Sequence, residues 1–181
     1  MAEIILVKLD WNGTAARVPM DRQYYVLHYG PEPEYPFGRK GLAISRAWRQ
    51  LASKQATGIL ILDGDVVIDP EDHRLMLASI DQAPQAIHVA PAKIWPVSTR
   101  REGWTWAHWS EHPSREVQTE DVKWYSFCYT YVPKTVIDQA LKDGLETWQY
   151  PGVDTRLCES ARKTRVPVNV VTSCQPKHVN Y

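Results

Sequence analysis

The chain has 181 residues, and its 21 Lys and Arg balance 21 Asp and Glu, which argues against a protein that coats nucleic acid by neutralising phosphates. This length predicts one domain with a core of its own. Three widely spaced cysteines without a C-x-x-C pair, no long apolar segment and no signal-peptide pattern favour reduced thiols and a cytoplasmic location.

The first elements of the chain are two strands and a helix. Residues 3–9 (EIILVKL) and 23–29 (QYYVLHY) are rich in apolar, β-branched and aromatic residues, so each predicts a strand. The stretch 17–22 between them is too short for a full crossover helix. A Pro-rich loop over 30–38 then leads into a helix predicted from about 41 to 54.

The central feature is a strand that ends in two aspartates. Residues 59–62 are apolar without a break and run directly into Asp63-Gly64-Asp65. A short apolar run of this kind is typical of a strand with helices on both of its faces. Two carboxylates at its carboxyl end can bind a hard divalent cation. Asp69 then predicts an N-cap, with Pro70 at the first position of a helix that ends at Gln82.

The second half of the chain surrounds a polar, Trp-rich segment at 96–122 that has no clear period. Loops of this length in a compact domain are usually functional, and the aromatic residues argue against disorder. Further strands are predicted at 86–95, where Pro91 makes the second half an edge or a loop, and at 122–132 and 166–172, with helices at 134–142 and 154–163. Together these elements predict an α/β domain with a mixed, mostly parallel sheet flanked by helices.

Three segments together resemble the family-2-like glycosyltransferases of GT-A fold. GILILDGDVVIDPEDHRLML (58–77) is similar to their strand, Asp-x-Asp and Pro-helix arrangement, and 39–48 to the helix that precedes it. The segment 148–158 resembles their Glu-Asp-x-Asp-Leu motif with a single acid, Asp154. The resemblance covers about 25–171 and implies one GT-A-like domain over 1–181. In that domain, about 1–95 would bind the nucleotide sugar and about 96–181 would shape the acceptor site.

The resemblance implies a donor site along the carboxyl edge of the sheet. Asp65, Asp63 and a C-terminal histidine, His178, would hold the metal, Mn²⁺ or Mg²⁺. The nucleotide-binding candidates are Asp10, Asn12, Arg39, Lys40, Arg46, Asp63 and Lys177. Alternatives remain: a solvated Asn-Gly turn after the first strand, a solvated basic face on the helix, and a disordered chain end.

The acceptor side has one predicted general base and five contact residues. Asp154, at a helix start, would take the proton from an acceptor hydroxyl and make the transfer inverting, unless it only caps the helix. Residues of the Trp-rich segment would stack on a sugar ring or an extruded base and meet phosphate. They are Arg100, Arg101, Trp104, Trp106 and Trp109. The alternation of Trp104 and Trp106 also fits a hairpin strand packed on the core.

We therefore expect a metal-dependent hexosyltransferase that uses a nucleotide-diphosphate sugar. Its acceptor hydroxyl would belong to a modified DNA base, a protein or a glycan. In size the chain resembles the small stand-alone transferases of bacteriophages. A non-catalytic glycan- or nucleic-acid-binding module of this fold is an alternative. A nucleotidyltransferase is another, although no Gly-rich phosphate loop follows Leu9.

Overall fold

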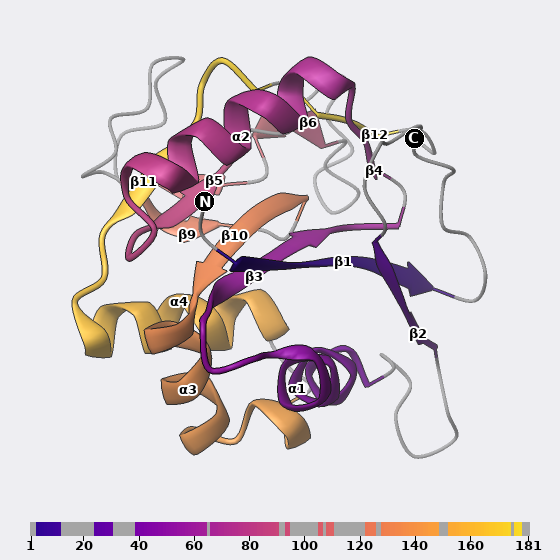
Figure 1. Ribbon diagram of the computed structural model, residues 1–181, viewed down its shortest axis with the longest axis vertical. Helices are drawn as coiled ribbons and strands as arrows, with labels where there is room; N and C mark the ends of the chain where they lie inside the picture. The colour runs from indigo at the N-terminus through magenta and orange to yellow at the C-terminus, as the bar shows by residue number, and fades with distance from the viewer. Residues whose placement is uncertain are drawn as a thin grey trace.

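The computed structural model describes residues 3–11, 24–30, 39–64, 66–90, 93–94, 105–106, 108–110, 122–125, 128–148, 152–174 and 176–178. At 11, 93–94, 105–106, 108–110, 122–125 and 178 the description covers the backbone alone. One six-stranded sheet runs through this part of the chain, in the order β11-β5-β10-β3-β1-β2 (Figure 1). Its strands are β1 (Glu3–Trp11), β2 (Tyr25–Tyr29), β3 (Ala56–Leu62), β5 (Ile87–Val89), β10 (Tyr129–Pro133) and β11 (Val168–Val170).

The sheet is mixed and mostly parallel, as the sequence predicts. β1 pairs in parallel with both β2 and β3, and β11 pairs in parallel with β5. β10 is the exception, because it lies antiparallel between β3 and β5. Since β1, β2 and β3 run in the same direction, their carboxyl ends meet at one edge of the sheet, and Asp63, which follows β3 directly, belongs to that edge.

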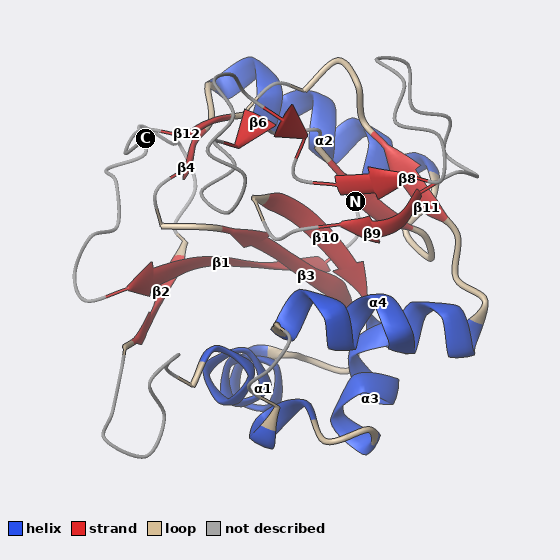
Figure 2. Ribbon diagram, turned by 180° about the vertical axis from the view of Figure 1, so that it is seen from behind, coloured by secondary structure: helices blue, strands red, loops and turns tan. Residues whose placement is uncertain are grey.

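Helices cover both faces of this sheet. α2 (Pro70–Gln82) lies on one face, and α1 (Lys40–Leu51), α3 (Lys134–Lys142) and α4 (Val153–Thr164) lie on the other (Figures 1 and 2). A short 3-10 helix, η2 (Leu145–Thr147), follows α3. The predicted start of α2 is confirmed, because the Asp69 carboxylate accepts a hydrogen bond from the Asp72 amide at 2.8 Å and Pro70 opens the helix.

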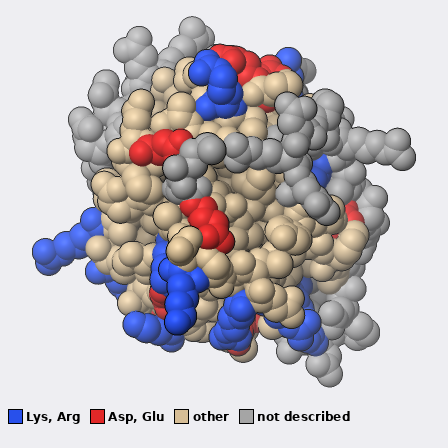
Figure 3. Space-filling view, viewed as in Figure 1, with Lys and Arg blue, Asp and Glu red and all other residues tan. Residues whose placement is uncertain are grey.

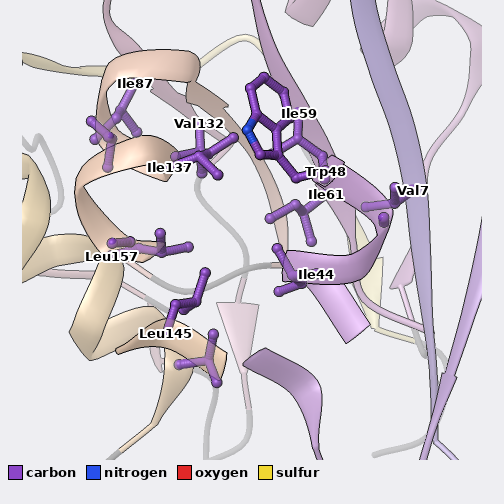
Figure 4. Close-up of a cluster of buried hydrophobic side chains, with 14 of the residues drawn as sticks. Val7, Ile44, Trp48, Ile59, Ile61, Ile87, Val132, Ile137, Leu145 and Leu157 are labelled. Carbon is purple, nitrogen blue, oxygen red and sulfur yellow. The ribbon is translucent and has the colours of Figure 1, made fainter. Parts of the chain in front are cut away.

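Two hydrophobic cores result from the alternation of side chains along the strands. Ile5, Val7 and Leu9 of β1 contribute to the core beneath α1, α3 and α4, whereas Leu6 contributes to the core beneath α2. Figure 4 shows the first core, with Trp48 of α1 among aliphatic side chains from the strands and from the other helices. Its three helices therefore form one packed layer on that face.

The predicted strand over 122–132 is wrong as a single element. β9 (Val122–Tyr125) pairs antiparallel with β8 (His108–Ser110), outside the main sheet, while β10 joins the main sheet after a turn at Cys128. The aromatic pattern runs through both strands, so periodicity gave no sign of the break between them.

The strand predicted over 86–95 is divided, in keeping with the interruption predicted at Pro91. β5 ends at Val89, and β6 (Lys93–Ile94) pairs with β7 (Thr105–Trp106) instead. Pro91 lies between the two, and proline cannot donate a ladder hydrogen bond. The Trp-rich segment therefore contains short strands, and the strand alternative for the backbone at Trp106 is confirmed.

Two further features concern the cysteine thiols and the length of the helices. Cys128, Cys158 and Cys174 are buried free thiols. Among the described residues, no helix has both the length and the apolar character that crossing a membrane requires.

Candidate active site at the carboxyl edge of the sheet

The first Asp of the Asp-x-Asp segment forms an ion pair with the start of α1. Asp63 follows β3 directly, and the Lys40 ammonium donates to its Oδ1 at 2.9 Å. Both side chains are mostly buried, with 23% of Lys40 and 21% of Asp63 exposed. The Lys40 nitrogen also lies 5.5 Å from the centre of the ring of Tyr29, the last residue of β2. Residues from β2, β3 and α1 thus converge on one cation.

Asp154 interacts electrostatically with Lys40 and Asp63. It is the second residue of α4, and burial raises the pKa of its carboxyl. The Lys40 charge and the Thr155 amide oppose that shift, while Asp63 adds to it. For Lys40, burial disfavours the charge, but Asp63, Tyr29 and Asp154 outweigh it and raise the pKa of the ammonium above its ordinary value. The predicted base and the Asp-x-Asp segment therefore sit close enough to influence each other.

The backbone before Asp154 is held by a local stack of side chains. The Trp148 indole N–H donates to the Gly152 carbonyl at 2.9 Å, and the Arg156 guanidinium lies 3.6 Å from the centre of the Trp148 ring. Gly152 occupies the N-cap position, and the Asp154 carboxylate accepts from the Thr155 amide at 2.9 Å. Asp154 is thus inside the helix and does not serve as its N-cap residue.

The end of the chain returns to the Asp-x-Asp segment. β4 (Val66–Val67) and β12 (Lys177–His178) pair antiparallel, with Val66 opposite His178 and Val67 opposite Lys177. Sequence patterns missed both strands, because each has only two residues. Val66, the residue after Asp65 in the sequence, therefore has a predicted metal ligand, His178, as its partner in this pair. The side chain of Lys177 is exposed.

The metal ligands themselves fall largely outside the described atoms. Asp65 is not described, and for His178 the description covers the backbone alone. Among the described side chains, no cluster of three or more His, Cys, Asp or Glu is arranged to bind a metal. The donor set Asp63, Asp65 and His178 nevertheless has the oxygen and imidazole chemistry that Mn²⁺ accepts.

Asp10 at the end of β1 is buried, which contradicts the alternative of a solvated aspartate. Only 2% of its side chain is exposed, and its Oδ2 lies 2.6 Å from Nδ1 of His28 on the neighbouring β2. The imidazole, by contrast, is 76% exposed. His28 and Tyr29 were not predicted as site residues, although both stand at the carboxyl end of a predicted strand, where open α/β sheets bind ligands.

Lys8 is the least expected residue on this side of the sheet. Only 5% of it is exposed, and its ammonium has no hydrogen-bond partner among the described residues. Burial lowers its pKa, and the nearby Asp10 carboxylate only partly opposes the shift. A lysine inside the apolar run EIILVKL was the sequence feature that marked this position.

Replacing Lys8 should stabilise the protein. Lys8→Met keeps the length of the side chain and removes a buried charge, so we expect a gain of about 1 kcal/mol in the free energy of unfolding and a rise in Tm of roughly 2–4 °C. The exposed Lys54→Met is the control, with no expected change.

The effect of pH on this difference has a definite sign. Because the folded pKa of Lys8 is lowered, the unfolded chain binds the proton more tightly, so wild-type stability should rise relative to Lys8→Met as the pH approaches 10. Denaturant titrations at pH 7 and pH 10 measure this. A constant difference between the two pH values, or a loss of stability in Lys8→Met, contradicts a buried unpaired ammonium.

The other predicted residues lie in different places. Arg39 stands at the N-cap position of α1, and Arg46 is exposed on the same helix. The positions outside the described residues are Asn12, Arg100, Arg101 and Trp104. Trp106 and Trp109 are in β7 and β8, where only the backbone is described, so their acceptor role stays a prediction.

Comparison with known proteins bears on the fold alone. No protein-family description matches the chain, and neither does any curated protein sequence. Among solved structures, the crystal structure of A197 from STIV matches with a TM-score of 0.53 at 12% identity, over 97% of this chain and 87% of A197. The two proteins therefore share an overall fold with very different sequences.

Proposed function

We propose that the protein is a metal-dependent glycosyltransferase that moves a sugar from a nucleotide-diphosphate sugar to an acceptor hydroxyl. The observation that carries this proposal is the convergence of Asp63, Lys40 and Asp154 at one edge of the sheet. They come from a strand end and from two helix starts that are far apart in sequence, yet their charges act on one another. An accidental surface aspartate has no reason to be mostly buried beside a second carboxylate and a lysine.

The proposed fold is GT-A-like, and the sheet is compatible with it. The Asp-x-Asp segment follows the parallel strand β3, whose other neighbour, β10, is antiparallel. A donor would lie along the edge formed by β1, β2 and β3. Asp63, Asp65 and His178 would hold Mn²⁺ or Mg²⁺, which supplies positive charge to the departing nucleoside diphosphate.

The two charged partners of Asp63 have different roles in this proposal. Lys40 keeps its proton because three groups favour its charge, so it can hold the Asp63 carboxylate in place and attract phosphate. Asp154 has a raised pKa, and a more basic carboxylate is a better acceptor for the proton of an attacking hydroxyl. The acceptor would approach from the side of α4.

Donor binding can be tested by calorimetry and thermal shift. UDP-, GDP-, ADP- and dTDP-sugars are offered with and without Mn²⁺ to the wild type and to Asp65→Ala, with Asp81→Ala on the exposed end of α2 as the matched control. We expect one nucleotide to bind only with Mn²⁺, and this binding to be lost in Asp65→Ala alone. Turnover of an isotopically labelled donor then measures transfer.

The outcomes separate the alternatives. Metal-dependent binding without release of labelled sugar, to water or to any acceptor tested, would indicate a non-catalytic module. Release of pyrophosphate from a nucleoside triphosphate would indicate a nucleotidyltransferase. An absence of binding to every nucleotide sugar, with or without Mn²⁺, overturns the proposal.

A further inference from the structure

A groove of about 470 Å³ lies between β2 and α1, and Tyr29, whose ring contacts the Lys40 ammonium, is one of its lining residues. Its volume is within the range of ordinary ligand sites. One wall consists of residues 25–30 and the other of one side of α1. The residues that line it are Tyr25, Val26, Leu27, His28, Tyr29, Gly30, Arg39, Leu42, Ala43, Arg46, Ala47, Gln50 and Leu51.

The strand wall of this groove is a backbone edge. Side chains on a strand alternate between the two faces of the sheet, so one face accounts for only every second residue. All of the residues from Tyr25 to Tyr29 line the groove, which means that it runs along the outer edge of β2. β2 is also the last strand of the described sheet, with β1 as its partner there.

The described residues of this edge lack lysine, proline and a bulge, three features that often protect a strand edge. Natural edge strands carry lysine, proline or a bulge that discourages further pairing. The sequence of β2, YVLHY, contains no lysine and no proline, and its register with β1 is regular. Tyr25 and Val26 are 48% and 46% exposed, which is unusual for large hydrophobic residues in the described part of the chain. Within the part of the chain that the structure describes, no strand pairs with the outer edge of β2, which leaves its backbone groups for another extended segment.

The helix wall of the groove is basic. Arg39 and Arg46 both line it, and no Asp or Glu is among its lining residues. They are seven residues apart on one helix, which corresponds to roughly 10 Å along the axis, so two separate acidic groups on an extended partner can reach them. Arginine is well suited to this task because its fork of N–H groups matches a carboxylate.

We propose that the edge of β2 binds an extended acidic peptide as an added strand, with its carboxylates at Arg39 and Arg46. The peptide backbone pairs with β2, and the acidic side chains point toward α1. Apolar side chains on the opposite face of the peptide lie beside Val26, on the other face of the sheet. The inference does not depend on glycosyl transfer, since it rests on the strand edge and the charges of the groove.

Two other occupants fit these observations less well. A second copy joined edge to edge would bring the arginines of both copies to one junction, where like charges repel. A nucleic acid has no peptide backbone that could pair with a strand edge. The chain also has a formal net charge of zero, which does not favour binding of a polyanion. On the face in Figure 3, basic and acidic side chains are interspersed; most of the basic ones lie toward the margin where α1 and α3 are, and others lie at the top, over α2.

The test uses synthetic nine-residue peptides in which glutamate and valine alternate, with binding measured by fluorescence anisotropy. The comparison peptides carry lysine in place of glutamate, or N-methyl groups on either all glutamates or all valines. Because alternate N–H groups of a strand point to the same side, only one of the two methylated peptides should fail to pair with β2. We expect a loss of about tenfold or more for that peptide and for the lysine peptide.

Protein variants locate the site. Arg46→Glu should reduce the affinity for the glutamate peptide about tenfold or more and improve that for the lysine peptide, while Lys54→Glu, the same charge change outside the groove, should alter neither by more than about threefold. Equal losses with both methylated peptides, equal affinity for the lysine and glutamate peptides, or no binding at millimolar peptide overturns the proposal. Self-association of the protein that the peptide does not disturb would assign the edge to a second copy.

Discussion

Asp154→Asn is expected to reduce the rate of sugar transfer by about 10²–10⁴-fold, while the affinity for the nucleotide-sugar donor stays close to that of the wild type. Asparagine has the same shape as aspartate and can still accept the hydrogen bond from the Thr155 amide, so α4 should form normally. It cannot take a proton from the acceptor hydroxyl. Single-turnover transfer and donor calorimetry, measured on the same preparation, separate the two effects.

The matched control for this variant is Glu159→Gln on the same helix. Glu159 pairs with Arg156 at 3.1 Å and is partly exposed, so its loss should change the rate by no more than about twofold.

The wild-type rate should also fall as the pH drops through the pKa of Asp154, which burial raises above the ordinary aspartate value of about 3.9. Equal rates for wild type and Asp154→Asn would remove Asp154 from the catalytic role.

Local chemistry accounts for the parts of the site that the sequence predicted. The strand before Asp63 is an unbroken apolar run, and Asp69 with Pro70 is a strong helix start. Patterns of this kind depend on neighbouring residues only. The elements predicted from them are therefore present in the structure, with small errors at their boundaries. α1, for example, ends at Leu51 and not at 54.

The parts that were missed depend on contacts between distant segments. β4 and β12 become strands only because Val66 meets His178, more than a hundred residues away. The pairing of Lys40 with Asp63 likewise requires the start of α1 to stand beside the end of β3. The spacing of apolar residues along the chain does not indicate either contact. The prediction that Asp63 and Asp154 belong to one site came from the resemblance to a known motif.

Gly41→Ala should destabilise the protein by about 2 kcal/mol or more, even though alanine favours a helix over glycine by about 1 kcal/mol. Gly41 is buried in the first turn of α1, where a Cβ would overlap the backbone carbonyl oxygen of Leu145 in η2 and lie 3.4 Å from a Val153 methyl. A backbone oxygen cannot move aside as a flexible side chain can. Chemical denaturation, with Ala43→Gly as a comparison for helix propensity alone, measures the cost.

This substitution should also disturb the proposed active site. Gly41 follows Lys40, and a Cβ at Gly41 would lie 3.4 Å from Val153, the residue before Asp154, so a methyl group there can change the distance between the lysine and the second carboxylate. If the helices separate to admit a methyl group, transfer per folded molecule should fall together with stability. A variant as stable and as active as the wild type would show that α1 and η2 do not pack this tightly, and that Lys40 does not depend on that contact for its position.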